Sequence, residues 1–146
     1  MSVMSGMNIS ASGMSAQRLR MDIISSNIAN VNTTRDENGE VYRRKTVVFA
    51  EKNQNSFESI LNKKTGASVG SGVKVTQIVE DTKTAMNMVY DPSHPDADEE
   101  GYVTYPNVNT VTEMTNLIDA SRSYEANVTA FNATKNMALK GLEVGK

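Results

Sequence analysis

Residues 110–140 read TVTEMTNLIDASRSYEANVTAFNATKNMALK, and the pattern of this stretch decides the fold. Apolar side chains recur along it in four heptads, with seven of nine seam positions apolar or aromatic. The first seam position holds Met114, Ser121, Val128, Lys135 and Leu142, and the second holds Leu117, Tyr124, Phe131 and Ala138. This spacing predicts one helix of roughly 45 Å, at ~1.5 Å per residue. We expect other helices to cover much of its length, because a small domain cannot.

The start of this helix has a sequence signal of its own. Thr110 is followed three residues later by Glu113, which matches the capping box. Pro106 lies just upstream, and neither Gly nor Pro follows before Gly141. We therefore expect Thr110 to cap the helix and the Glu113 carboxylate to reach back to it.

A second helical pattern occupies the N-terminal part of the chain, from Ser10 to Asn30. One seam position recurs every seven residues, at Met7, Met14, Met21 and Ile28. The intervening position holds Ile24 and Val31, with Ser10 and Gln17 as weaker members. Residues 1–8 are expected to fray. Methionine tolerates imperfect partners, so this stripe suits either the C-terminal helix or other subunits, and the two interpretations are compatible.

The middle of the chain predicts short strands rather than helices. Asn38-Gly39 is a hairpin signal. The expected strands are Val41–Ala50, Gly72–Asp81, Ala85–Tyr90 and Gly101–Tyr105. Between the first two, residues 51–72 are expected to form a mobile loop with one short helix at Ser56–Leu61. A sheet this small gains from packing against a helix.

These elements predict an α+β fold. The long N- and C-terminal helices would pack antiparallel as a coiled-coil-like pair, with a small antiparallel β domain inserted between them. The expected segments are an N-terminal helix in residues 1–34, a β-rich domain in 35–106 and a C-terminal helix in 107–146. The first helix is shorter than the second, so part of the longer stripe is left for association with other chains.

Composition excludes several classes of function. A net charge of −2 does not favour nucleic acid or acidic membranes as partners, and no apolar run is long enough to span a membrane. With no Cys, thiol catalysis and Cys-ligated zinc are absent. The single histidine, His94, has no catalytic motif around it, and the acidic run Asp96–Gly101 lacks the Glu that an EF-hand needs at its twelfth position. We expect no enzyme activity, cofactor or metal site, and the N-terminus shows no signal-peptide pattern.

The candidate site is therefore a packing and assembly surface. Its residues on the first helix are Met14, Met21, Ile24, Asn27, Ile28 and Asn30. Its residues on the second helix are Met114, Leu117, Ile118, Arg122, Tyr124, Glu125, Asn127, Val128 and Phe131. The apolar members are expected to hold the helix pair. The three Asn residues either fix register, as a buried amide does in coiled coils, or act as caps and surface residues. Arg122 and Glu125 are expected to form ion pairs between subunits.

Three motifs resemble those of the bacterial flagellar axial proteins. Residues 26–33 read SNIANVNT and resemble their N-terminal signature. The pattern of Met114, Ile118, Ala120, Arg122 and the run Tyr124–Asn127 resembles their C-terminal signature. Residues 101–109, GYVTYPNVN, resemble the segment that leads into it in proximal rod proteins. In this order, and with this length, the motifs resemble the family of flagellar basal-body rod proteins, although residues 51–72 match no motif.

The resemblance implies a structural subunit of the flagellar basal-body rod. Such a subunit assembles through its terminal helices into an axial shaft that transmits torque and encloses the export channel. It implies copies of the chain itself and the rod proteins FlgB, FlgF and FliE as partners. It also implies export to the periplasmic rod by the flagellar type III apparatus without signal cleavage, and no nucleic acid or membrane insertion.

Alternatives remain at this point. One is another axial subunit, such as FlgB, or a type III needle-like protein, although an insertion of about 70 residues does not fit a plain helical hairpin. Another is a soluble binding module that docks its long helix on one unrelated partner. An amphipathic membrane-surface protein fits less well, because the helices lack a Lys/Arg-rich polar face.

Overall fold

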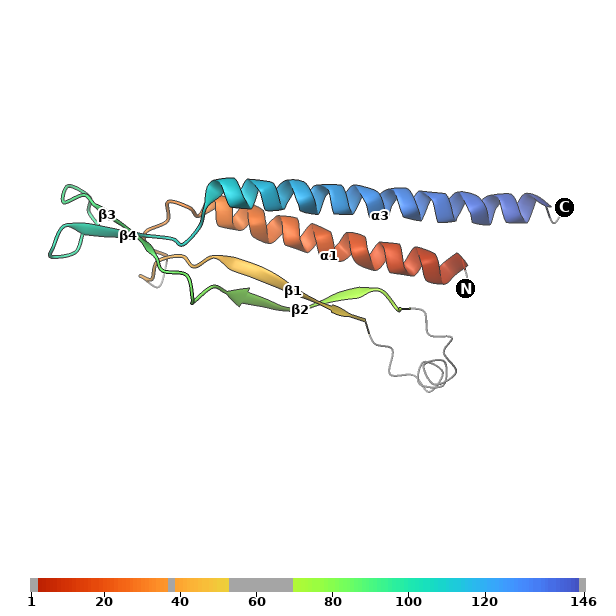
Figure 1. Cartoon of the computed structure of the whole chain (residues 1–146), viewed down its shortest axis with the longest axis horizontal. Helices are drawn as coiled ribbons and strands as arrows, with labels where there is room; N and C mark the ends of the chain where they lie inside the picture. The colour runs from red at the N-terminus through yellow and green to blue at the C-terminus, as the bar shows by residue number, and fades with distance from the viewer. Residues whose placement is uncertain (1–2, 37–38, 53–69, 145–146) are drawn as a thin grey trace. The chain divides into compact units, whose positions relative to one another are not determined.

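The computed structural model describes residues 3–36, 39–52 and 70–144, and Figure 1 shows their course. The elements, in chain order, are α1 (Val3–Ala29), β1 (Lys45–Glu51), β2 (Val73–Glu80), β3 (Asn87–Tyr90), β4 (Tyr102–Tyr105) and α3 (Thr110–Val144). A long helix at each end with small antiparallel sheets between them confirms the expected α+β class.

The chain divides into two compact units. Unit 1 comprises Met1–Leu19, Val48–Gln77 and Ala120–Lys146, and unit 2 comprises Arg20–Val47 and Ile78–Asp119. Each unit therefore combines part of α1, part of α3 and part of the β region. The division into segments at residues 34/35 and 106/107 stays a prediction about the chain's organisation.

Helix α1 begins earlier than its sequence pattern indicates. Residues 3–8, which were expected to fray, are helical. Gly6 lies in this first part and packs close to Thr134, since a Cβ built on it would lie 3.6 Å from Thr134 Cγ2. This contact gives the start of the helix a partner within unit 1. The helix ends at Ala29, where the Asn30 backbone N–H donates to the Ser26 carbonyl at 3.1 Å.

Helix α3 starts at Thr110 as expected, but its N-cap is Asn109. Asn109 Oδ1 accepts from the Thr112 N–H at 3.1 Å, and the Asn109 carbonyl accepts from the Glu113 N–H at 2.9 Å. The expectation of a Thr110 cap with Glu113 reaching back was wrong. An Asn side chain one residue upstream takes the cap because Asn is among the best N-cap residues. The Glu113 carboxylate lies elsewhere, in a fully buried position.

The strands form two separate two-stranded sheets, β1–β2 and β3–β4. The β3–β4 hairpin is antiparallel, with Asn87 opposite Tyr105 and Tyr90 opposite Tyr102. Strand β1 begins at Lys45 rather than Val41. Just before it, the Asn107 side chain accepts from the backbone N–H of Arg44, so that group is not available to a sheet.

Two expectations for the β region fall partly outside the described residues. Gly39 has φ of 82°, and the Asp36 N–H donates to the Glu40 carbonyl at 2.9 Å, which brings the two ends of this segment together. Asn38, the other member of the turn signal, is not among the described residues. The expected loop and short helix lie mainly in residues 53–69, also outside them.

The buried apolar core is small in both units. Among the described residues, the buried apolar side chains of unit 1 are Ala16 and Ala120, and those of unit 2 are Ile24 and Val103. Two of these four are alanines, which bury little area, so hydrophobic burial alone contributes modestly to stability. The polar contacts of unit 2 therefore matter more than they would in a larger core.

Candidate assembly interface

The helix pair in unit 1 is antiparallel and closely packed. A Cβ on Gly6 would lie 3.6 Å from Thr134, and a Cβ on Gly13 would lie 2.6 Å from Asn127 Oδ1. A step of seven residues forward on α1 is thus a step of seven back on α3. Shielded positions of α3 in this unit include a series with heptad spacing, at Ala120, Tyr124, Asn127, Phe131, Thr134 and Ala138. The contact is a coiled-coil-like seam built around small residues.

The second expected seam position of α3 is where the sequence places it, and the first is shifted by one residue. Leu117, Tyr124 and Phe131 are all partly shielded. In the first position Ser121 and Val128 are partly shielded too, whereas Met114 is 54% exposed, and Lys135 and Leu142 are exposed as well. Their place in the seam is taken by Glu113, Ala120, Asn127 and Thr134. These residues are small or polar, so a search for apolar side chains passes over them.

The same shift of one residue occurs on α1. Ile24 is buried as expected, whereas Met14, Met21 and Ile28 are only partly shielded. Gly6 and Gly13 lie against side chains of α3, and the Asn27 amide donates to Glu113; each of the three is one position before a member of the methionine and isoleucine series. The methionines therefore flank the seam. This placement leaves part of each thioether side chain accessible to other chains.

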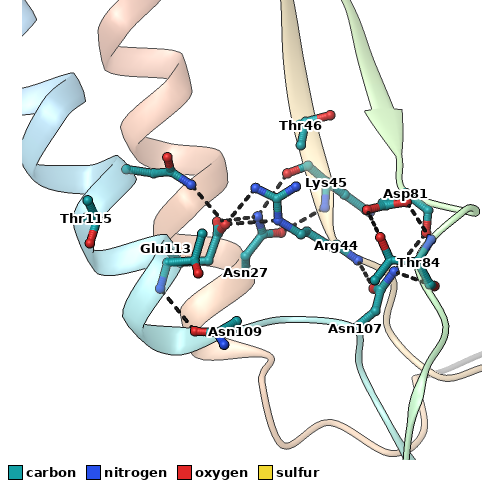
Figure 2. Close-up of polar contacts among 12 residues, drawn as sticks. Asn27, Arg44, Lys45, Thr46, Asp81, Thr84, Asn107, Asn109, Glu113 and Thr115 are labelled. Carbon is teal, nitrogen blue, oxygen red and sulfur yellow. Dashed lines mark hydrogen bonds and ion pairs between the residues drawn. The ribbon is translucent and has the colours of Figure 1, made fainter.

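Glu113 is the centre of a buried polar cluster in unit 2, shown in Figure 2. Its Oε1 accepts from Arg44 Nε at 2.9 Å and Nη2 at 2.8 Å, and its Oε2 accepts from Asn27 Nδ2 at 2.9 Å. Asn116 Nδ2 adds a longer bond of 3.3 Å. A buried carboxylate is tolerated only when it is paired and hydrogen-bonded, and here it has both kinds of partner.

Asn27 joins the helices to the strand that follows. It is fully buried. Its Nδ2 donates to the Lys45 carbonyl at 2.8 Å as well as to Glu113, and its Oδ1 accepts from the Lys45 N–H and the Tyr42 hydroxyl, both at 2.9 Å. The amide therefore uses two donors and two acceptor sites at once. Any shift of α1 against this strand would break several of these bonds together.

Asn107 fixes the other side of Arg44. Its Oδ1 accepts from the Arg44 backbone N–H at 2.9 Å, and its Nδ2 donates to the carbonyls of Asp81 at 2.9 Å and Thr84 at 3.2 Å. The segment before α3 is thereby tied to the residue that precedes β1 and to the turn after β2. We call the set Asn27, Arg44, Asn107 and Glu113 the polar clasp.

The turn bound by Asn107 contains an aspartate with a perturbed pKa. The Thr84 hydroxyl donates to Asp81 Oδ2 at 2.7 Å, and the Thr84 and Lys83 N–H groups donate to Oδ1 at 3.0 Å. These bonds, the hydroxyl first, lower the pKa of Asp81 below 3.8. Ser93 lowers the pKa of Asp91 in the same way, with its hydroxyl 2.6 Å from Oδ1. Both carboxylates therefore order local turns in their ionised form.

The two other asparagines singled out by sequence make local bonds. Asn30 Nδ2 donates to the Ser26 carbonyl at 2.8 Å, and its Oδ1 accepts from Thr33 Oγ1 at 3.1 Å, both at the end of α1. Asn127 Nδ2 donates to the Ser123 carbonyl one turn earlier, at 2.7 Å, while its side chain lies against Gly13. Asn30 is thus placed as a cap, and Asn127 is placed in the helix seam.

The remaining candidate residues lie on the outer side or the flank of α3. Ile118 is 53% exposed, Arg122 and Glu125 are exposed, and Val128 is partly shielded. Their role between subunits stays a prediction.

Three clasp residues were missed by sequence reasoning, namely Arg44, Asn107 and Glu113. A usable signal existed for Glu113, because it lies seven residues before Ala120 and fourteen before Asn127, at a seam position. A carboxylate at a seam position requires a cation, and Arg44 lies in the strand region where one is available.

Among the described residues, no group of three or more His, Cys, Asp or Glu is placed to hold a metal ion. Within the same part of the chain, neither long helix has the length and apolar content that crossing a membrane requires.

Comparison with known proteins agrees with the motifs at both ends. The family described as "Flagella basal body rod protein" matches residues 7–35. The family described as "Flagellar basal body rod FlgEFG protein C-terminal" matches residues 99–144. The first segment contains most of α1 with Asn27, and the second contains α3 with Asn107 and Glu113.

Full-length relatives extend the likeness to the whole chain. The flagellar basal-body rod protein FlgC of Bacillus subtilis is 53% identical over 152 residues, covering 100% of both chains. That of Borreliella burgdorferi is 42% identical, covering 99% of this chain and 98% of the relative. That of Escherichia coli O6:H1 is 39% identical, covering 100% of both. Identity at this level over whole chains means that this chain belongs to the FlgC family of flagellar basal-body rod proteins.

Proposed function

We propose that this structural rod subunit assembles through its terminal helices, with copies of itself and related rod proteins packed along α1 and α3. The FlgC relatives, which are rod proteins rather than enzymes, support a role in the flagellar basal body. The mechanism is packing rather than chemistry. The helices would form the axial shaft, carry torque through their contacts and enclose the export channel.

One observation carries this proposal. The outer side of α3 in unit 2 has an exposed apolar row, in which Val111, Met114 and Ile118 follow helical spacing and are 75%, 54% and 53% exposed. Exposed apolar rows of this kind mark association surfaces. The C-terminal part of α3, in unit 1, exposes Met137, Leu139 and Leu142 in addition. A helix that serves only its own chain would not need this outer face.

The proposal also concerns partners and location. Within the rod, we propose FlgB, FlgF and FliE as neighbours, and the flagellar type III export apparatus as the route to the periplasmic rod. The first part of α1 takes part in the packing of unit 1, because Gly6 lies against Thr134.

Rod assembly tests the role of the apolar row. The double variant Met114→Glu/Ile118→Glu should fold but fail to enter basal bodies isolated from cells, because both charges lie on the exposed row. Thr112→Glu is the matched control, since Thr112 is exposed on the same helix but lies off the row. Helix content by circular dichroism and the amount of subunit in purified basal bodies are the two measurements. Normal incorporation of the double variant would show that the row is not an assembly surface.

A further inference from the structure

A groove in unit 1 lies along α1 and β2. It has a volume of about 380 Å³, with apolar walls from Ala16, Leu19, Val73 and Val75. Lys52 and Lys74 also line it, and both are exposed. Apolar walls with two cations beside them suit an occupant that is apolar and acidic at once.

The backbone holds this groove in a fixed form. Ser12 Oγ donates to the Ile9 carbonyl at 2.7 Å and accepts from the Val73 N–H at 3.0 Å, which ties β2 to α1. Gly72 has φ of 99°, and a Cβ on it would overlap Ser12 Oγ. Only glycine fits at this close approach, so the packing of Gly72 against Ser12 holds β2 beside α1 and defines the groove.

The β3–β4 hairpin of unit 2 has the complementary properties. The register places Met88, Tyr90 and Tyr102 on one face, and these side chains are 59%, 64% and 39% exposed. The two tyrosine rings pack edge to face at 5.3 Å. The connecting turn adds Glu99 and Glu100, both exposed. No Lys or Arg occurs in the sequence between Lys83 and Arg122.

The charges of the two units are opposite. The described residues of unit 1 include six Lys or Arg and three Asp or Glu, a net charge of +3. Those of unit 2 include six Lys or Arg and twelve Asp or Glu, a net charge of −6. Two copies of the chain therefore attract each other when unit 1 of one meets unit 2 of the other, and like units repel.

We propose that the β3–β4 hairpin of one copy docks in the α1–β2 groove of a neighbouring copy. The apolar face of the hairpin would cover the groove walls, and its acidic turn would meet Lys52 and Lys74. The lysines can also interact with the faces of the tyrosine rings. The inference rests on the proposed function, because it adds a contact between copies to assembly along the helices.

Such a contact joins two different surfaces, so it is heterologous. Each bound pair keeps one unoccupied groove and one unoccupied hairpin, and further copies can add at either end. A contact of this kind builds a ring where the rotation between copies closes, and a helical array where it does not. It would also weaken as salt concentration rises, because exposed charges are screened.

Cross-linking provides the direct test, since the chain has no Cys. Cells expressing equal amounts of Lys74→Cys and Glu99→Cys chains are treated with a short bismaleimide, and their basal bodies are isolated. We expect cross-linked dimers of the two chains. The control pairs are Lys83→Cys with Glu99→Cys, and Lys74→Cys with Glu143→Cys. These use an exposed lysine outside the groove and an exposed glutamate outside the hairpin, and we expect no dimers from them.

Charge reversal provides a second test that does not depend on cross-linking geometry. Lys52→Glu/Lys74→Glu and Glu99→Lys/Glu100→Lys should each lower the amount of chain in basal bodies, about tenfold if the contact behaves like other complementary charge pairs. Combining all four substitutions in one chain should restore it. Restoration would not follow if the substitutions acted only by unfolding either unit.

The outcomes separate this inference from the proposed function. Normal incorporation of both reversal variants without the expected dimers overturns the hairpin contact and leaves helix-mediated assembly in place. Cross-linking of Lys74→Cys to a different rod protein overturns the assignment of a second copy. Absence of the unmodified chain from basal bodies overturns both proposals.

Discussion

Two N–H groups of Arg44, from Nε and Nη2, converge on a single oxygen of Glu113 at 2.9 and 2.8 Å. The Glu113 side chain is 1% exposed and that of Arg44 is 26% exposed. Because water does not reach the carboxylate, its bonds with Arg44 and Asn27 must replace the lost hydration. This pair connects the strand region to the first turn of α3. Among the contacts of unit 2, we expect the loss of this pair to lower the free energy of unfolding most.

We predict that Glu113→Ala destabilises the monomer by about 3–5 kcal/mol, because it leaves a partly buried guanidinium without its carboxylate. Urea unfolding followed by circular dichroism measures the change. The double variant Arg44→Leu/Glu113→Leu should recover much of the loss, since an apolar pair of similar volume avoids the cost of burying charge. A loss below about 1 kcal/mol for Glu113→Ala would contradict the importance of the pair.

Asp81 gives a prediction for pH dependence. Its pKa in the folded chain is lowered, chiefly by the Thr84 hydroxyl, so folding favours the ionised form. The resulting stabilisation is present above the unfolded value of 3.8 and is lost as the pH falls through the lower, folded pKa. Stability should therefore decline below about pH 4, and less steeply in Thr84→Val, which removes the hydroxyl donor.

The carboxyl resonance of Asp81, followed by NMR during acid titration, measures this shift directly. Thr84→Val should raise the pKa of Asp81 and leave that of Asp91 unchanged. Ser93→Ala is the matched control, because the Ser93 hydroxyl donates to Asp91 and lowers its pKa, and its loss should leave the pKa of Asp81 unchanged. An Asp81 titration that is identical with and without Thr84 would refute the explanation.

We predict that an alanine substitution has opposite effects on stability at Gly13 and at Gly6. A Cβ at Gly13 would lie 2.6 Å from Asn127 Oδ1, closer than real contacts allow, so Gly13→Ala should destabilise unit 1. A Cβ at Gly6 would have an ordinary contact of 3.6 Å with Thr134. Gly6→Ala should therefore stabilise α1 by roughly 0.5–1 kcal/mol through helix propensity. Thermal unfolding of both variants measures the difference.

A double-mutant cycle checks the cause. Asn127→Ala removes the side chain that the new methyl group would meet, so Gly13→Ala should cost much less in that background. The same loss in both backgrounds would mean that Asn127 is not the obstacle.

The sequence predicted the parts of this fold that depend on apolar periodicity. Leu117, Tyr124 and Phe131 lie on the shielded side of α3, and the ends of β2 were expected within one residue of Val73 and Glu80. These features follow from the spacing of apolar residues along the sequence, which decides the shielded face of a helix or strand without contacts from distant residues. They were enough to establish the fold class and, with the terminal motifs, the family.

The parts that sequence reasoning missed depend on contacts between distant residues. Glu113 looked like half of a capping box, because nothing local shows that Arg44, 69 residues away, will meet it. The one-residue shift of the seam has the same origin. Gly13, Ala120 and Asn127 fill it because small side chains let the helices approach, a property that a search for large apolar residues does not detect.

We expect amide hydrogen exchange in the dilute monomer to be slow in part of unit 2 and faster in part of unit 1. The N–H groups of Arg44 and Lys45 are bound by the buried side chains of Asn107 and Asn27, so we predict slow exchange there before assembly. Residues 5–16 of α1 contain two glycines and pack against a seam of small residues, so their amides should exchange faster.

Assembly should slow the hydrogen exchange of residues 5–16 and leave that of Arg44 and Lys45 nearly unchanged. Most helical stability comes from tertiary packing, so residues 5–16 should gain protection when neighbouring subunits cover α1. The amides of Arg44 and Lys45, already protected, should change little. In Glu113→Gln monomer, however, these two amides should exchange faster, because the clasp loses its ion pair while the surface of unit 1 is untouched. Equal protection of residues 5–16 and of Arg44 and Lys45 in the unassembled chain would show that α1 needs no neighbour to be stable.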